Sequence, residues 1–205
     1  MGNAEELKNY PLMTTRLMLK GTRFVEDAMK NVDCNFGIFL DVYAFDNTPD
    51  DDKLFRKQAN KAWFWGKLLI LRHISSPVLP FKGFKGKIIS VICACVHGVM
   101  SICHVSHKFL YNQAKKACMK YNDVETNRIA YFCDTIACSN MIDLREAKPW
   151  IKLPFEDVMM PFPKNIDAIM TDFYGDYMKL PPVEKRKNHY PHILDFGPYE
   201  EKDNE

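Results

Sequence analysis

The first quarter of the chain carries short apolar runs separated by turn residues, a pattern that predicts β structure. Residues 16–19 and 22–25 are two such runs, and Lys20-Gly21 stands between them. A two-residue turn that contains glycine accepts positive φ, so this stretch predicts a hairpin.

Residues 36–43 predict the next strand, because they are rich in β-branched and aromatic side chains. Asn35 and the turn sequence 46–49 bound this strand, and we expect it to be buried. Asp41 lies within it among apolar neighbours, where a carboxylate is costly unless it has a partner.

Helical periodicity dominates the middle of the chain. Residues 53–74 interleave basic side chains with aromatic and aliphatic ones and end before Pro77. Residues 86–120 keep apolar side chains at helical spacing opposite a polar face, which predicts a second long helix. The apolar run 88–105 is interrupted by serine, histidine and glycine, so it is a poor membrane span and is expected to form a buried or interfacial helix.

The last third of the chain mixes both kinds of element. Residues 152–156 and 158–161 predict a short hairpin. Pro163-Lys164-Asn165 opens a helix that is expected to run through about Tyr174, where Gly175 stops it. Pro181-Pro182 opens one more short helix. The order of elements predicts an α+β fold, with a small mixed or antiparallel sheet and a helical middle block.

Charge is segregated along the chain. The net charge of +2 combines −5 over residues 1–52, +13 over residues 53–122 and −6 over residues 123–205, and the middle segment contains no Asp or Glu. We expect one domain, made of a β-rich part, a basic helical block and a C-terminal hairpin with helices over these three segments. The small total excludes a globally basic nucleic-acid binder, so no nucleic-acid partner is expected.

The cysteines predict a reducing compartment. There are seven, none in a Cys-x-x-Cys pair, and residues 1–6 are polar, without the apolar core of a signal peptide. The expected location is the cytoplasm, including a peripheral position at the inner face of the membrane. The pairs Cys93/His97 and Cys103/His107 have i, i+4 spacing but lie on different helix faces, which favours small buried cysteines over a zinc site.

The basic and aromatic block over residues 53–120 leaves three alternatives open. It can lie on anionic lipid with Trp63 and Trp65 at the interface, or it can receive a phosphate-rich substrate. It can also be a solvated face beside the acidic flanks, which is what a run of charge usually is.

Individual polar residues are also candidates for a site. Asp41 either serves a metal or substrate or is a structural carboxylate, whereas Asp46 suits a cap of the following turn better. Lys179, Arg186 and His189 can converge on a phosphate, since arginine offers a planar fork and histidine a titratable nitrogen. The alternative is that they are exposed charges on a turn.

Residues 174–189 are dense in aromatic, proline and charged residues and read Tyr-Gly-Asp-Tyr-Met-x-Leu-Pro-Pro-x-Glu-Lys-Arg-x-x-His. This string looks like the signature that ends the LicD family of phosphocholine transferases, and two other stretches resemble motifs of the same family in the same order. Residues 37–46 resemble its Gly-Ile-Phe-Ile-Asp-Ile-Phe-Pro-Leu-Asp strand, and residues 153–156 with the following Pro161-Phe162-Pro163 and Asp167 resemble its last hairpin. Residues that also fit the family's preceding hairpin are Tyr10, Pro11, Arg16, Thr22 and Glu26.

The resemblance implies a nucleotidyltransferase-like fold, which the family shares with fukutin-type proteins. It implies transfer of phosphocholine, or a related phospho-alcohol, from a CDP-choline-like donor to a glycan or lipid-linked glycan acceptor of the lipopolysaccharide or teichoic acid type. Asp41 matches the third metal carboxylate of the fold, so Mg²⁺ or Mn²⁺ is the implied cofactor. The residues implied for phosphate or substrate contacts are Arg16, Asp46, Lys179, Arg186 and His189.

This sequence also departs from the family. Its members carry a Gly-rich loop and an Asp-x-Asp motif upstream of the matched region, and these supply the other two metal carboxylates. We therefore expect this chain alone to bind the metal poorly, as a truncated or split product or as a degenerate relative kept for binding. The alternative function is a non-catalytic fragment or a membrane-surface interaction module. Val183 and Tyr190 are milder departures.

Overall fold

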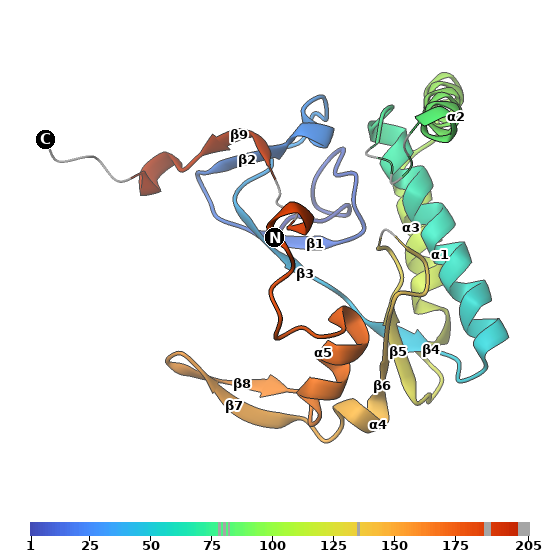
Figure 1. Ribbon diagram of the computed structural model, residues 1–205. Coiled ribbons are helices and arrows are strands. Elements are labelled where there is room, and N and C mark those ends of the chain that lie inside the picture. The colour runs from blue at the N-terminus through green and yellow to red at the C-terminus, as the bar shows by residue number, and fades with distance from the viewer. Residues whose placement is uncertain (78, 80, 82, 135, 187–189, 201–205) are drawn as a thin grey trace, which may run out of the picture. The chain divides into compact units, whose positions relative to one another are not determined.

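The fold is α+β, as the sequence predicts, with helices and small antiparallel sheets (Figure 1). The computed structural model describes residues 1–77, 79, 81, 83–134, 136–186 and 190–200. The chain divides into two compact units, each built from separate stretches of sequence. Unit 1 comprises residues 1–44, 64–115 and 188–205, and unit 2 comprises residues 45–63 and 116–187.

Unit 1 contains two antiparallel strand pairs. Strand β1 (Thr15–Met18) pairs with β3 (Phe39–Val42), and β2 (Arg23–Glu26) pairs with β9 (Pro191–Asp195). The predicted hairpin between the first two strands is therefore wrong, although Gly21 does adopt a positive φ of 87°.

The hairpin does not form because residues 36–38 accept backbone hydrogen bonds from the chain both before and after the Lys20-Gly21 turn. The Leu19 amide donates to the Ile38 carbonyl oxygen over 2.7 Å, and the Phe24 amide donates to the Phe36 carbonyl oxygen over 3.0 Å. The turn at Lys20-Gly21 thus leads the chain from one sheet into another.

Strand β3 confirms the strand predicted around Asp41, but it is shorter and only half-buried. Leu40 and Val42 are exposed, at 65% and 41%, while Phe39 and Asp41 on the other face are partly buried. Successive side chains of a strand point to opposite faces. Asp41 therefore lies on the partly covered face with Phe39, although its sequence neighbours Leu40 and Val42 point to the exposed face.

Three helices occupy the middle of the chain. Helix α1 (Asp52–His73) confirms the first predicted helix, and it belongs to unit 2 up to Trp63 and to unit 1 from Phe64. The single helix predicted over residues 86–120 is wrong, because the structure has α2 (Gly83–Ile102), α3 (His107–Cys118) and a 3-10 turn over Met119–Tyr121.

The break between α2 and α3 lies at His104, whose φ of 49° is left-handed. A left-handed residue cannot continue a right-handed helix, and apolar periodicity does not reveal such a residue when it is not glycine. The core of unit 1 combines the helices with the N-terminal segment. Its buried members are Ala4, Tyr10, Val25, Met29, Phe36, Leu69, Ile74, Met100 and Leu110.

Unit 2 contains a three-stranded antiparallel sheet, β4–β5–β6, and a separate hairpin. The sheet strands are β4 (Asp46–Thr48), β5 (Arg128–Tyr131) and β6 (Asn140–Asp143), and α4 (Leu144–Ala147) follows them. The core packs Phe55, Ala59 and Ala62 of α1 against Ala117, Cys118, Ala130 and Phe132.

The hairpin and helix predicted for the last third are confirmed. Strands β7 (Ile151–Phe155) and β8 (Val158–Phe162) pair with each other, and α5 (Ile166–Tyr174) follows. The Asn165 side chain caps α5 by accepting from the Ala168 amide, and Gly175 ends it with a φ of 67°. The short helix expected after Pro182 is a 3-10 turn over Val183–Lys185.

Candidate functional site

Arg16 is the centre of a polar cluster in unit 1. Its Nε donates to Asp41 Oδ1 over 3.0 Å and its Nη2 donates to Glu26 Oε2 over 3.1 Å. The Arg16 residue is 4% exposed, and the side chains of Asp41 and Glu26 are 21% and 18% exposed. One buried cation therefore neutralises two half-buried carboxylates. Asp41 thus has the partner that a carboxylate among apolar neighbours needs.

Strand pairing creates this cluster. Arg16 on β1 lies directly opposite Asp41 on β3, and Glu26 lies at the end of β2. The Arg16 guanidinium also stacks on Phe39, with its Cζ 3.6 Å from the ring centroid. A stacked guanidinium that donates to two carboxylates is held in one orientation, because the planar fork fixes the direction of each donor.

Two further residues of the family resemblance support the same strands. The buried Tyr10 hydroxyl donates to the Thr14 carbonyl oxygen over 2.9 Å. Burial and, more weakly, the Asp41 carboxylate raise the pKa of Tyr10, so it stays neutral. The buried Thr22 hydroxyl donates to the Leu19 carbonyl oxygen over 2.8 Å and accepts from the Ile38 amide over 2.9 Å.

The second oxygen of Asp41 has a weaker contact. Asp41 Oδ2 accepts a long hydrogen bond of 3.4 Å from the Tyr43 hydroxyl. Hydrogen bonds weaken as they lengthen, so this oxygen is held less tightly than Oδ1. Oδ2 is thus the Asp41 atom that can turn toward a ligand.

Unit 1 also has a surface depression that was not predicted, and residues that line it lie close in sequence to Arg16 and Glu26. It has a volume of about 420 Å³, and its lining includes Lys20, Thr22, Arg23 and Gly37. Lys20 and Arg23 are exposed and stand on either side of Gly21-Thr22, so both cations lie where the chain leads from β1 into β2. Two cations beside a backbone turn form a suitable site for a phosphate group. The signal in the sequence was a pair of basic residues around a glycine turn.

Asp46 is a structural residue of unit 2 at the start of β4. Its Oδ1 accepts from Asn122 Nδ2 over 2.7 Å, and burial raises the pKa of this carboxyl while the Asn122 bond opposes the rise. The neighbouring Asn47 amide donates to Asn122 Oδ1 over 2.9 Å. These hydrogen bonds to Asn122 connect β4 to the segment that follows α3.

The predicted basic residues near the C-terminus are exposed in unit 2. Arg186 Nε donates to the Pro181 carbonyl oxygen over 2.9 Å and thereby closes the loop, while the Lys179 side chain is exposed. Tyr177 anchors the loop to α5, because its hydroxyl donates to Asp167 Oδ1 over 2.8 Å. His189 lies outside the described residues. Arg16 and Asp41 belong to unit 1, whereas Asp46, Lys179 and Arg186 belong to unit 2.

The histidines that raised the question of zinc have other partners. His97 Nδ1 is 2.7 Å from the Leu71 carbonyl oxygen, and His107 Nδ1 is 2.7 Å from His73 Nε2. Burial lowers the pKa of His73 to about 4, and the charges of His107, Arg72 and His97 act in the same direction. These contacts join α1 to α2 and α3 within unit 1.

The residues present do not fit an Mg²⁺ or Mn²⁺ ion by themselves. Asp41 and Glu26 supply the hard oxygen donors that such ions prefer, but the guanidinium of Arg16 takes one oxygen of each. Among the described residues, no group of three or more His, Cys, Asp or Glu side chains is placed to hold a metal. A complete site would need carboxylates beyond the two around Arg16.

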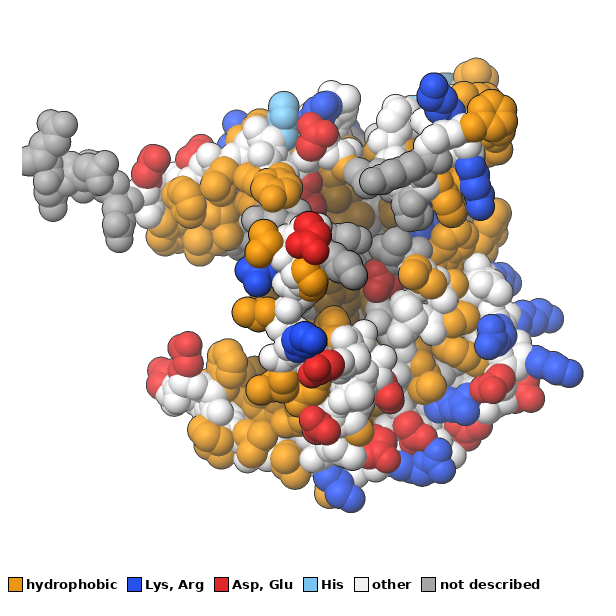
Figure 2. Space-filling view, in the orientation of Figure 1, with side chains coloured by type: hydrophobic (Ala, Val, Ile, Leu, Met, Phe, Trp, Pro, Cys, Tyr) orange, Lys and Arg blue, Asp and Glu red, His pale blue; other side chains and the backbone are white. Residues whose placement is uncertain are grey.

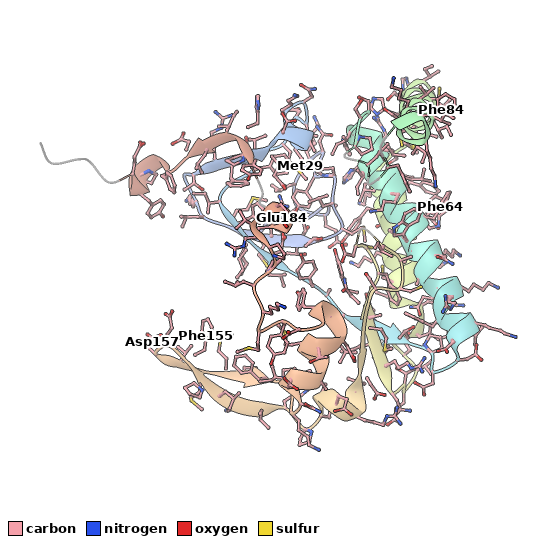
Figure 3. All side chains as sticks on the ribbon, viewed as in Figure 1. Met29, Phe64, Phe84, Phe155, Asp157 and Glu184 are labelled. Carbon is pink, nitrogen blue, oxygen red and sulfur yellow. The ribbon has the colours of Figure 1, made fainter. Side chains whose placement is uncertain are left out.

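An exposed apolar surface covers the β7–β8 hairpin of unit 2. Figure 2 shows hydrophobic side chains gathered over these strands, and Figure 3 shows Phe155 and Asp157 at the tip. Phe155, Val158 and Met159 are at least half exposed. The hairpin is thus presented to solvent rather than packed into the core of its unit.

Comparison of the chain with protein-family models, with curated proteins and with solved structures finds no match.

Proposed function

We propose that this chain serves in LicD-type transfer of phosphocholine, or a related phospho-alcohol, from a CDP-activated donor to a cell-surface glycan. The observation that carries the proposal is the convergence of Arg16, Glu26 and Asp41. They come from separate parts of the motif-bearing sequence, and they form one ion-paired cluster in unit 1. Tyr10 and Thr22, which belong to the same resemblance, are buried in the same unit.

In this proposal Arg16 is a positioning residue. It holds Asp41 through Oδ1 and leaves Oδ2 to face a ligand, while Phe39 keeps the guanidinium plane in place. Lys20 and Arg23 bind the diphosphate of the donor in the depression that they line. Lys179 and Arg186 belong to unit 2 and are separate candidates for phosphate or acceptor contacts, as the resemblance implies.

The reaction is a substitution at phosphorus. An acceptor hydroxyl oxygen forms a bond to the phosphorus that carries the alcohol, the bond from this phosphorus to the bridging oxygen breaks, and CMP leaves. The acceptor proton passes to a base or to water, so charge and atoms balance. Positioning and charge neutralisation account for most of the catalysis in phosphoryl transfer, and cations beside the diphosphate supply the neutralisation.

A second candidate is a non-catalytic chain that binds the donor and does not transfer it. The observation that favours it is the pairing of both cluster carboxylates with Arg16, because a carboxylate committed to a guanidinium is a poor metal ligand. Both candidates predict donor binding in the depression, and only the first predicts turnover.

The test measures binding and turnover separately. Calorimetry with CDP-choline should show binding that the double substitution Lys20→Gln/Arg23→Gln weakens at least fivefold. The matched control is Lys57→Gln/Lys61→Gln, which removes two exposed cations from α1 and should leave the affinity unchanged. CMP release is then followed with Mg²⁺ or Mn²⁺ and a teichoic acid or lipopolysaccharide acceptor.

The outcomes separate the two candidates. CMP release that depends on the acceptor and falls in Asp41→Asn supports the transferase. Binding without CMP release under every condition supports the non-catalytic chain. Absence of CDP-choline binding by the unsubstituted protein would overturn both.

A further inference from the structure

Helix α2 exposes an apolar stripe along its whole length. Six hydrophobic residues of this helix are between 45% and 80% exposed. We call them the outer α2 stripe: Phe84, Ile88, Val91, Ile92, Val99 and Ile102. Figure 3 labels Phe84 on α2, and Figure 2 shows hydrophobic and basic side chains together over this helix.

The stripe is one face of the helix. Successive residues in an α-helix are roughly 100° apart, so the six side chains fall within an arc of roughly 100°. Amphipathic helices of soluble proteins turn such an arc toward the core, and α2 turns it away. The polarity of this helix is therefore inverted.

The opposite face of α2 is the one that packs on unit 1. Cys93 and Met100 are buried, Val96 packs against the core, and His97 is bonded to the Leu71 carbonyl oxygen of α1. Helix α2 is therefore packed on unit 1 through one face while its apolar stripe points to solvent. Its packed face also carries Ser90 and Ser101, so the helix is not apolar all round.

We infer that the outer α2 stripe docks α2 flat on an anionic lipid bilayer. Among the described helices, α2 is long and apolar enough to cross a membrane, and only 17% of its apolar stretch is buried. Crossing would require the His97 bond to Leu71 and the burial of Met100 to be given up, whereas lying in the interface keeps both. The helix is about 30 Å long, so all six side chains can enter the acyl boundary together.

Charge supports a bilayer as the occupant. Lys85 and Lys87 lie exposed in the first two turns of α2, and the segment 53–122 contains no carboxylate to repel lipid phosphates. If a second copy of the chain packed on the stripe instead, Lys85 and Lys87 of the two copies would face each other without compensating carboxylates from the segment 53–122. The inference goes beyond the proposed transfer and does not depend on it.

The experiment is sedimentation of the full chain with vesicles of phosphatidylcholine alone and with 30% phosphatidylglycerol, at low and high salt. The wild type should bind the anionic vesicles more tightly than the neutral ones, and salt should weaken the difference. Val91→Glu/Val99→Glu should lower the partition coefficient at least tenfold. Lys85→Gln/Lys87→Gln should reduce the preference for anionic lipid while leaving binding to neutral vesicles unchanged.

The matched control is Val124→Glu, which places the same charge at a valine of similar exposure in unit 2 and should leave binding within twofold of wild type. Circular dichroism checks that each variant is folded. Equal vesicle binding by Val91→Glu/Val99→Glu and wild type would overturn the inference. So would a lipid-free dimer, seen by analytical ultracentrifugation, that the same double substitution dissociates.

Discussion

Arg16 carries two ion pairs at once, and its removal should cost more than the loss of one bond. Arg16→Ala removes the buried cation that pairs with the half-buried carboxylates of Glu26 and Asp41, so we expect a loss of about 2–4 kcal/mol in the free energy of unfolding. Urea denaturation measures this loss. Arg16→Lys should recover only part of it, because an ammonium group cannot stack on Phe39 and reach both carboxylates.

A triple variant separates charge from packing at Arg16. Arg16→Met/Glu26→Gln/Asp41→Asn removes the cation and both anions, and its stability should return to within about 1 kcal/mol of wild type. A triple variant as unstable as Arg16→Ala would show that the cluster acts through shape and not through charge.

His73 should make the stability depend on pH. Its pKa is about 4 in the folded chain, below the ordinary value of 6.5, so the unfolded chain binds more protons between these values. The stabilising contribution is complete above pH 6.5 and is lost as the pH falls toward 4. We expect a loss of about 1–2 kcal/mol, after allowance for solvent screening at this half-buried residue.

The measurement for His73 is the urea midpoint between pH 7.5 and pH 4. His73→Gln should flatten the decline relative to wild type, whereas His192→Gln, at an exposed histidine of β9, should not. Parallel curves for wild type and His73→Gln would contradict the assignment.

At the residue scale the sequence predicted that Asp41 needs a partner but did not identify that partner. Asp41 among apolar neighbours required a partner, and the pattern showed this. Arg16 as that partner depends on the register of β1 against β3, which is a long-range property that local patterns do not contain. Lys20 and Arg23 were missed for a similar reason, since basic residues at a turn are common on any surface.

Helices α2 and α3 meet at a residue whose backbone conformation is unfavourable for it. His104 is left-handed, with a φ of 49°. His104→Val should destabilise the chain by about 1–2 kcal/mol, because a β-branched side chain tolerates this conformation poorly, and His104→Gly should stabilise it by about 0.5–1 kcal/mol. Thermal denaturation measures both changes.

The control for the break is Asn112→Val, which introduces valine at an exposed position within α3. It should change stability by less than His104→Val does, because its φ is that of an ordinary helix. Equal effects of the two valines would mean that helix propensity, and not the left-handed turn, sets the cost.

Elements with a strong local signal were predicted, whereas several very short strands and the pairing of distant strands were not. Helix α1, the β7–β8 hairpin and α5 follow from periodicity and turn residues. Strands β4, β5, β6 and β9 are three to five residues long, and β4 and β9 pair with strands far away in sequence. Such short segments lack enough repeats for a pattern to stand out.

Two helices link the units of the molecule, and this should make unfolding cooperative. Helix α1 and helix α3 each pass from one unit into the other along a continuous backbone. Leu110→Ala in the core of unit 1 and Phe132→Ala in that of unit 2 should each cost about 3–4 kcal/mol. We expect each substitution to shift a single transition.

Tryptophan fluorescence and far-ultraviolet circular dichroism, followed together during denaturation, test this expectation. Coincident curves in the wild type and in both variants support one cooperative transition. Two separated transitions, with each substitution moving only one, would show that the units unfold independently.

The pairing of β2 with β9 has a consequence for how the chain is made. All residues of unit 2 have been synthesised once the ribosome reaches residue 187, whereas β2 has to wait for residues 191–195. Domains commonly fold as units while translation proceeds, so unit 2 should acquire protease resistance first and β2 should remain unpaired until β9 has been made. Nascent chains arrested before β9 has left the ribosome should show cleavage near Arg23 that disappears once residues 191–195 are available. Strand β9 thus closes a sheet whose other strand was synthesised long before it, and unit 1 becomes complete only after all of unit 2 has been made.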